Sequence, residues 1–161
     1  MLDVDGVLTD GRIVMDHRGN EIKSFDVRDG QGIRLLQRAG VKVGIISGRS
    51  SAAVRHRAKD LGIELLYLRA DDKLAAYEKI KRDTDFSDYE IAYVGDDLVD
   101  LPLLRRVGMA ITVNDCWPGL KPMTDYVTRA SGGKGAAREV AELLLKAQRK
   151  WVRVSRKYYL A

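Results

Sequence analysis

The opening stretch Met1-Leu2-Asp3-Val4-Asp5-Gly6-Val7-Leu8-Thr9-Asp10-Gly11 is the part of the chain around which the fold is organised. An apolar start runs into three carboxylates, and residues that favour turns follow at once. On a short strand Asp3 and Asp5 point to the same face, because alternate residues of a strand share a face. Such a pair is costly unless a proton or a metal ion lies between the carboxylates. The stretch therefore predicts a buried strand that ends at a site for a positive charge.

Composition indicates an ordinary globular protein. The 161 residues are 45% hydrophobic and 32% charged, which fits one domain over residues 1–161 with a good core. No apolar run approaches the length of a membrane span, and the first residues lack the build of a signal peptide. The lone Cys116 cannot form an internal disulfide, which fits a reducing compartment. We therefore expect a cytoplasmic protein that does not bind a membrane.

The basic charge of the chain makes nucleic-acid binding a function to consider, because the net charge is +5 and the sequence pI is about 9.3. The excess gathers in a basic C-terminal tail, about residues 149–161, in which Trp151, Tyr158 and Tyr159 interleave with cations and offer stacking surfaces. No recognisable nucleic-acid-binding motif accompanies them. A basic balance also suits a small anionic substrate, and we expect no nucleic-acid partner.

Runs of strand length alternate with helical periodicity along the chain, which predicts an α/β protein with a Rossmann-like, three-layer parallel sheet. Before the first helix, Gly19 and Asn20 separate two short β-prone runs, which predicts a hairpin over about residues 12–26 that is placed to act as a flap. The expected strands cover residues 41–46, 63–68, 89–94, 109–113 and 126–128. The expected helices run from Asp29 to Gly40, from Ser50 or Ser51 to Gly62, from Asp71 or Asp72 past Ile80, from Leu101 to Gly108, and through Val140 to Leu145.

Polar clusters follow several of these strands, and ligands bind at the carboxyl ends of strands in such sheets. The strand ends would together form a crevice, and a phosphate monoester bound there could be attacked by a carboxylate of the first strand. A Mg²⁺ ion held by Asp3, Asp5 and Asp96 would offset the repulsion between phosphate and carboxylates, and Lys73 would add a second cation. Ser47 offers a hydroxyl beside backbone N–H donors. A carboxylate two residues after the nucleophile could protonate the leaving oxygen and then deprotonate water.

These motifs resemble those of the haloacid dehalogenase superfamily and, more narrowly, of the 3-deoxy-D-manno-octulosonate 8-phosphate (KDO 8-phosphate) phosphatase family. The broad resemblance is carried by Asp3 to Gly11, Ser47-Gly48-Arg49, Lys73 and Gly95 to Asp100. The narrow one is carried by Thr9-Asp10-Gly11 with its hairpin, Gly95 to Pro102 and Gly132 to Val140. Together they span nearly the whole chain.

The resemblance implies a role for each matched residue. Asp3 is the implied nucleophile and a Mg²⁺ ligand, and Asp5 is the implied general acid and base whose backbone carbonyl also binds the metal. Asp96 is the third implied ligand. The phosphoryl group is held by Ser47 and Lys73, with Gly6, Gly48 and Arg49 beside it, whereas Asp97 and Asp100 support the site through hydrogen bonds or metal-bound water. Asp10 is interpreted as a turn former.

The resemblance also implies a homotetramer without a separate cap domain, in which the hairpin and the tail of one subunit help to close the active site of a neighbour. Family members carry several residues before the first motif, whereas here only Met1 and Leu2 precede Asp3. We therefore expect the first strand to be nearly absent as written: either the numbering starts late or the chain is truncated, and a true truncation would weaken the core beneath the nucleophile.

Three other functions compete with a KDO 8-phosphate phosphatase. A phosphatase of a related sugar acid, such as a nonulosonate 9-phosphate, or of another small phosphate ester would use the same catalytic set, and the leaving-group contacts would come from Arg49, Arg55, the hairpin and the tail. A phospho-receiver also combines carboxylates, Mg²⁺, Ser/Thr and Lys, but there the acidic pair comes before the phosphoryl acceptor. A nucleic-acid binder rests on charge alone.

Overall fold

The computed structural model describes residues 1–159, and its centre is a parallel sheet. Strands β3 (Gly44–Ser47) and β4 (Leu65–Leu68) pair on one side, and β5 (Ala92–Gly95), β6 (Met109–Thr112) and β7 (Tyr126–Val127) pair on the other. Leu2 forms parallel bridges to Ile45 and to Val94, so the opening residues join the two halves. The order across the sheet is therefore β4-β3-Leu2-β5-β6-β7.

The opening segment is short but is hydrogen-bonded on both sides. Leu2 donates its N–H to Gly44 O at 2.9 Å and accepts from Ile46 N at 3.0 Å. On the other side Asp3 N donates to Val94 O, and Met1 O accepts from Val94 N, each at 3.0 Å. Leu2 and Val4 are buried in the core. The first strand is thus reduced to the bridges of Leu2, as expected, and these bridges place Asp3 between β3 and β5.

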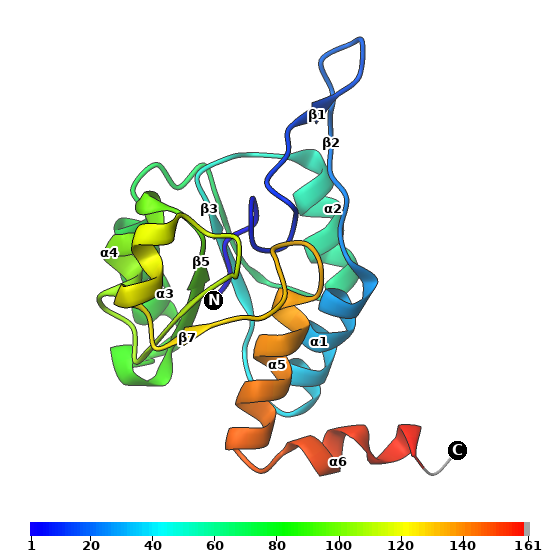
Figure 1. The fold of residues 1–161 in the computed structure, drawn as a ribbon, viewed down its shortest axis with the longest axis vertical. Coiled ribbons are helices and arrows are strands. Elements are labelled where there is room, and N and C mark those ends of the chain that lie inside the picture. The colour runs from blue at the N-terminus through cyan, green and yellow to red at the C-terminus, as the bar shows by residue number, and fades with distance from the viewer. Residues whose placement is uncertain (160–161) are drawn as a thin grey trace.

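Helices cover both faces of the sheet (Figure 1). Helices α1 (Val27–Arg38), α2 (Ala52–Leu61) and α5 (Ala136–Ala147) lie on one side, and α3 (Lys73–Thr84) and α4 (Leu101–Leu104) lie on the other. Their apolar faces meet the sheet, as expected for this layer architecture. The predicted three-layer α/β fold without a separate cap domain is confirmed for the described residues.

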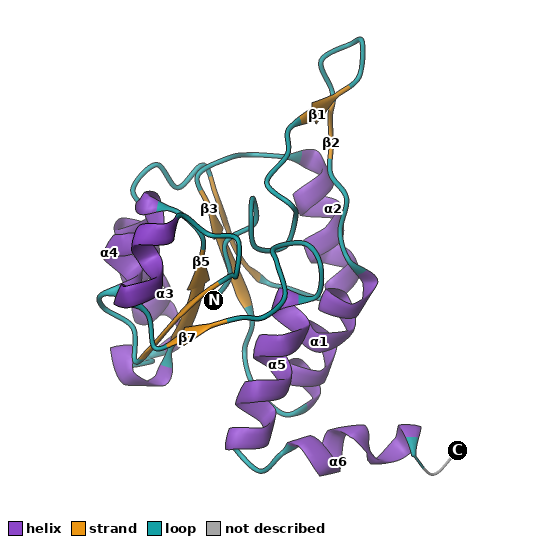
Figure 2. Ribbon diagram, viewed as in Figure 1, coloured by secondary structure: helices purple, strands orange, loops and turns teal. Residues whose placement is uncertain are grey.

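The hairpin consists of β1 (Val14–Met15) and β2 (Glu21–Ile22), which pair antiparallel and project from the body (Figure 2). Asp16 closes its tip by accepting from the N–H groups of Arg18 and Asn20 at 2.8 and 2.9 Å. We call residues 12–26 the flap. Its predicted position is confirmed, although the paired strands are shorter than the β-prone runs.

Several predicted boundaries are wrong, each for a local reason. Residues 41–43 precede β3, and Tyr89 and Glu90 belong to the 3₁₀ helix η1 (Asp88–Glu90), where the Glu90 carboxylate accepts from the N–H and hydroxyl of Ser87. Helix α4 ends at Leu104, well before Gly108. Ser51 occupies the N-cap position of α2 but its side chain makes no cap hydrogen bond, whereas Asp72 caps α3 with two.

The C-terminal tail folds back on the body. It forms α6 (Trp151–Ser155) and the 3₁₀ helix η4 (Arg156–Tyr158), with Trp151 within cation–π distance of Arg138 and Lys146. The Tyr158 hydroxyl accepts from Gln31 and Arg38 of α1 at 2.7 and 2.5 Å. The predicted tail also includes residues 160–161, which lie outside the described residues. None of the described helices is long and apolar enough to cross a membrane.

Candidate active site

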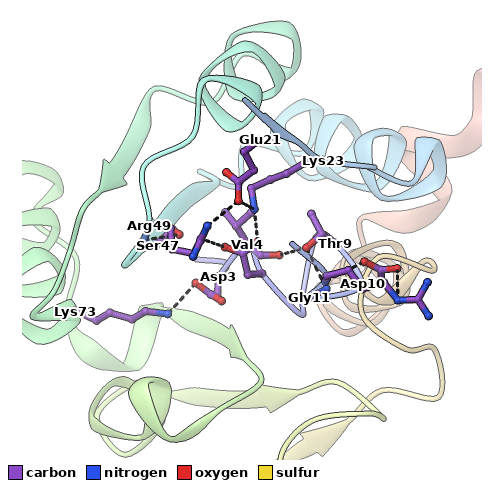
Figure 3. A network of polar contacts seen from close by, with 12 residues as sticks. Asp3, Val4, Thr9, Asp10, Gly11, Glu21, Lys23, Ser47, Arg49 and Lys73 are labelled. Carbon is purple, nitrogen blue, oxygen red and sulfur yellow. Dashed lines mark hydrogen bonds and ion pairs between the residues drawn. The ribbon is translucent and has the colours of Figure 1, made fainter. Parts of the chain in front are cut away.

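The nucleophile candidate Asp3 lies at the carboxyl end of the opening segment, between β3 and β5. Its side chain is 8% exposed, and Lys73 Nζ donates to Asp3 Oδ1 at 2.7 Å (Figure 3). Lys73 is the first residue of α3, a position where most lysines are exposed, yet its side chain is only 6% exposed. A lysine buried at a helix start needs a carboxylate partner, and here that partner is the predicted nucleophile.

Gly6 brings the opening loop close to the end of β5. Its φ is +90°, and a Cβ at this position would lie 2.0 Å from Asp96 Oδ2. A residue with a side chain could not occupy this place without displacing Asp96. The loop after Asp3 therefore packs directly against the Asp96 carboxylate, which follows β5. This contact agrees with the position of Asp3 and Asp96 at the ends of neighbouring strands.

Asp100 is the buried anchor of the site and is fully inaccessible. Its Oδ1 accepts from Lys73 Nζ and from the Tyr93 hydroxyl, each at 2.6 Å, and its Oδ2 accepts from the N–H groups of Asp96 and Asp97 at 2.9 and 3.2 Å. These four donors occupy both oxygens of the carboxylate. Asp100 thus fixes Lys73 on one side and the turn that carries Asp96 on the other.

Burial and like charge act together on the carboxylates. Burial, only partly opposed by the Lys73 charge, raises the pKa of Asp3 to about 6. Burial and the charges of Asp3 and Asp100 raise the pKa of Asp96 to about 8. Burial by itself lowers the pKa of the Lys73 ammonium, but the charges of Asp3 and Asp100 outweigh burial and the net pKa is raised. The cluster therefore carries one cation for three carboxylates.

This cluster fits a hard divalent cation. One carboxylate oxygen each from Asp3, Asp96 and Asp100 lies within 4.8 Å of the others. Because Asp100 already accepts four hydrogen bonds, Asp3 and Asp96 are the members whose oxygens are free to bind an ion. Oxygen donors and surplus negative charge are what Mg²⁺ requires, and an ion would relieve the repulsion that raises the Asp96 pKa.

Ser47 is the last residue of β3 and is buried. Its Oγ accepts from Arg49 N at 3.3 Å, and its carbonyl accepts from Ala70 N at 3.0 Å. The turn Ser47-Gly48-Arg49 therefore stands beside the opening segment, with Gly48 exposed. This turn can present a hydroxyl and backbone N–H groups to an anion near Asp3.

Asp5 and Arg49 are drawn away from the cluster toward the flap. Lys23 forms an ion pair with Asp5 Oδ1, and Arg49 Nε lies 3.7 Å from Asp5 Oδ2. Arg49 also donates to Glu21 Oε1 at 2.9 Å. The Asp5 carboxylate therefore lies outside the Asp3–Asp96–Asp100 group and beside the flap.

Two other acidic residues serve the local backbone. Asp97 is exposed and caps the 3₁₀ helix η2 (Leu98–Asp100) by accepting from Leu98 N at 2.8 Å. Asp10 accepts from Arg12 N at 3.2 Å, as expected of a turn former. Of the predicted site residues, Asp3, Gly6, Lys73, Asp96 and Asp100 come together in one cluster. Asp5 and Arg49 lie beside this cluster and contact the flap. Ser47 and Gly48 lie at the end of β3. The Asp97 side chain accepts a hydrogen bond from the backbone of Leu98.

Sequence reasoning missed Tyr93 and Lys23, which contact site residues directly. Tyr93 lies in the apolar strand β5 and has the signature of a core residue, although a buried tyrosine hydroxyl needs a partner. Lys23 lies in a flap of mostly exposed residues, and only its contact with Asp5 distinguishes it.

The pocket opposite the carboxylates contains none of these residues. A cavity of about 460 Å³ lies beneath the amino ends of the strands, lined by Met1, Val41, Phe86, Ile91 and other apolar residues. It holds no carboxylate pair and no predicted site residue, so the chemistry lies at the other edge of the sheet.

Comparisons with known proteins agree with this geometry. The family model of the haloacid dehalogenase-like hydrolases matches residues 19–108. The 3-deoxy-D-manno-octulosonate 8-phosphate phosphatase KdsC of Escherichia coli K12 is 47% identical over 150 residues, which are 93% of this chain and 80% of that protein. The crystal structure of the phosphatase of the same name from Yersinia pestis has a TM-score of 0.91 at 46% identity and covers 92% of this chain and 80% of that one.

A third similar structure carries ligands. The 3-deoxy-D-manno-octulosonate 8-phosphate phosphatase of Moraxella catarrhalis, in complex with a magnesium ion, a phosphate ion and KDO, has a TM-score of 0.95 at 41% identity over 98% of this chain and 90% of that one. The fold and the carboxylate cluster thus define a hydrolase of the haloacid dehalogenase-like class. Within that class, the chain belongs to the family of 3-deoxy-D-manno-octulosonate 8-phosphate phosphatases, which are phosphoric monoester hydrolases.

Proposed function

We propose that the protein hydrolyses a sugar-acid phosphate monoester, KDO 8-phosphate, to KDO and phosphate, with Mg²⁺ as cofactor. The observation that carries this proposal is the Asp3 carboxylate held 2.7 Å from Lys73 Nζ inside a group of three carboxylates with surplus negative charge. The Moraxella catarrhalis relative, whose crystal holds magnesium, phosphate and KDO, supports the substrate and the ion.

In the first half of the proposed reaction, an Asp3 carboxylate oxygen attacks phosphorus and the bond between phosphorus and the sugar oxygen breaks. Asp5 gives its proton to the leaving oxygen, and an aspartyl-phosphate remains on Asp3. Lys73 balances charge on the transferring group and keeps Asp3 oriented. The hydroxyl of Ser47 and the N–H groups of its turn bind the phosphoryl oxygens, with Gly6, Gly48 and Arg49 beside them.

In the second half, water attacks phosphorus and gives its proton to the Asp5 carboxylate, so that phosphate leaves and Asp3 is regenerated. Asp3, Asp96 and the Asp5 backbone carbonyl are the proposed holders of Mg²⁺, and Asp97 and Asp100 support them. When bound, the ion neutralises the carboxylates and the phosphate, which lets the two anions approach.

The proposed substrate is tested by phosphate release from purified protein with Mg²⁺. KDO 8-phosphate, a nonulosonate 9-phosphate and common sugar phosphates are compared, and we expect KDO 8-phosphate to have the highest kcat/KM. Equal low rates on all esters would contradict the narrow substrate. Catalytic release of many phosphates per chain excludes a phospho-receiver, which would be phosphorylated once.

We further propose a homotetramer in the cytoplasm. The flap exposes Ile13, Val14, Met15 and Ile22, each 49–57% accessible, on an element that projects from the body. Exposed apolar side chains on a projecting hairpin favour a subunit contact. The free, buried Cys116 is consistent with a reducing compartment. Sedimentation analysis that shows a monomer at micromolar concentration would contradict the assembly.

A further inference from the structure

Lys23 is the most deeply buried charge that the flap contributes. It follows β2, and its side chain is only 1% exposed although most of the flap is open to solvent. Its Nζ forms an ion pair with Asp5 Oδ1 and lies 3.1 Å from Glu21 Oε1 (Figure 3). An ammonium group enclosed to this degree is costly without carboxylate partners, so the pair with Asp5 has a structural reason to persist.

Arg49 completes a closed network around the same carboxylate. It donates to Glu21 Oε1 at 2.9 Å, and its Nε lies 3.7 Å from Asp5 Oδ2. Each oxygen of Asp5 therefore faces one cation, Lys23 from the flap and Arg49 from the turn after β3. Two cations and two carboxylates balance, so this network does not need the metal ion that the neighbouring cluster needs.

We propose that Lys23 is a positioning residue, which holds the Asp5 carboxyl group at the leaving-group side of the site and thereby couples the position of the flap to the proton-transfer step. The inference rests on the proposed function, in which Asp5 protonates the leaving oxygen. Within residues 1–159 Lys23 contacts Asp5 and Glu21 and does not contact Asp3, Lys73 or Asp96, so Asp5 is its direct link to the proposed reaction.

Action through Asp5 has a distinctive consequence, because the need for a proton depends on the leaving group. A sugar alkoxide is strongly basic and leaves poorly without a proton, whereas p-nitrophenolate leaves readily without one. Displacing the Asp5 carboxyl should therefore slow formation of the aspartyl-phosphate from an alkyl phosphate much more than from an aryl phosphate. A defect in Asp3, Lys73 or the metal site would slow both esters.

The test compares Lys23→Met and Lys23→Arg with the wild type on KDO 8-phosphate and on p-nitrophenyl phosphate, with Mg²⁺ present. We expect Lys23→Met to lower kcat/KM, which reports only the steps up to formation of the aspartyl-phosphate, by about 30- to 100-fold on the sugar phosphate and by less than about 3-fold on the aryl phosphate. Lys23→Arg, which keeps the charge, should recover most of the loss. Lys59→Met makes the same change at an exposed lysine of α2, outside the flap, and should leave both rates unchanged.

A double-mutant cycle separates positioning from general damage to the flap. If Lys23 acts through Asp5, Lys23→Met should cause no further loss on the sugar phosphate in an Asp5→Asn background. Equal losses on both esters, or losses that multiply in the double variant, would overturn the role of Lys23 and leave the phosphatase proposal intact. A wild type that releases no phosphate from either ester would overturn the proposed function and this inference with it.

Discussion

Backbone hydrogen bonds hold the Asp3 side of the active site, whereas side-chain ion pairs hold the flap side. The opening segment is bonded to β3 and β5 on both edges, with N···O distances of 2.9 to 3.0 Å. Within residues 1–159 the paired part of the flap consists of β1 and β2, which pair only with each other, and its link to Asp5 is made by the side chain of Lys23. The proposed nucleophile is thus held by the sheet, whereas the proposed general acid is held by side-chain contacts with the flap.

The two sides also differ in charge. Lys73 faces the three carboxylates Asp3, Asp96 and Asp100, which leaves a surplus of negative charge, whereas Lys23 and Arg49 balance Asp5 and Glu21. Burial, together with the charges of Asp3 and Asp100, raises the pKa of Asp96 to about 8. A bound cation is therefore needed to balance the charge on the Asp3 side, whereas the flap side is already balanced.

The largest effect is expected from Asp3→Asn. The amide has nearly the same shape but is not nucleophilic, so turnover should fall by at least about 10³-fold. Activity is measured as phosphate release, and thermal unfolding of the variant checks that its fold is intact. Retention of more than a trace of activity would show that Asp3 is not the nucleophile.

Thorough chelation of metal ions with EDTA should also abolish the activity of the wild type, and added Mg²⁺ should restore that activity.

The second prediction tests whether the loop after Asp3 has a rigid support. Gly133 N donates to Val7 O at 2.9 Å, and a Cβ on Gly132 would lie 1.7 Å from Gly6 O. Gly132→Ala must therefore push the loop that carries Gly6 against Asp96. We expect a loss of about 2 to 4 kcal/mol in the free energy of unfolding, measured with urea, and a strong fall in turnover.

The same substitution in the flap provides the comparison. Gly19 lies at the tip with φ +79° and no other heavy atom within 4 Å of a Cβ, so Gly19→Ala meets only backbone strain. We expect it to cost about 1 kcal/mol and to leave turnover nearly unchanged. Equal costs at the two glycines would contradict the picture of a rigid support on one side and an open element on the other.

Tyr93→Phe should have a moderate effect on the Asp3 side. It removes the hydroxyl that donates to Asp100 Oδ1 at 2.6 Å, so that among residues 1–159 Lys73 is left as the only donor to that oxygen. Loss of a buried hydrogen bond to a charged group costs about 1.5 kcal/mol of stability. Because Asp100 orients Lys73, we also expect kcat to be roughly tenfold lower. Tyr67→Phe is the matched control, because it removes a hydroxyl bonded to Asp83 at 3.1 Å outside the carboxylate cluster. If both variants lose activity alike, Tyr93 has no particular role in the site.

The Asp3 side of the site was the more predictable of the two. The alternation of strands and helices puts Asp3, Ser47 and the residues after Gly95 at one edge of the sheet, and side chains at that edge must lie close together. The positions of the carboxylates therefore follow from sequence spacing. The exact strand starts do not, because residues such as Tyr89 favour a strand by composition but belong to a 3₁₀ helix shaped by Ser87 and Glu90.

The residues that escaped prediction share one property: their partners are set by tertiary geometry. Tyr93 is an unremarkable strand residue until the turn of η2 brings Asp100 beside its hydroxyl. Lys23 would face solvent if the flap stood free, and it becomes buried because the flap lies against Asp5. No local pattern encodes either contact, whereas the glycine and aspartate motifs encode their own turns.

The smallest effect is expected in the pH dependence of metal stabilisation, which tests the surplus charge directly. In the metal-free fold the pKa of Asp96 is raised to about 8, above its ordinary value of 3.8, by burial and by the charges of Asp3 and Asp100. Between these two values the folded chain holds a proton that the unfolded chain has lost, so stability falls as pH rises from 5.5 to 8. Mg²⁺ replaces that proton at pH 8 but must displace it at pH 5.5. We therefore expect the rise in melting temperature caused by Mg²⁺ to be larger at pH 8 by about 3 °C. In Asp96→Asn the difference between the two pH values should shrink, and a rise in the wild type that is equal or larger at pH 5.5 would show that the carboxylate cluster is not where the cation binds.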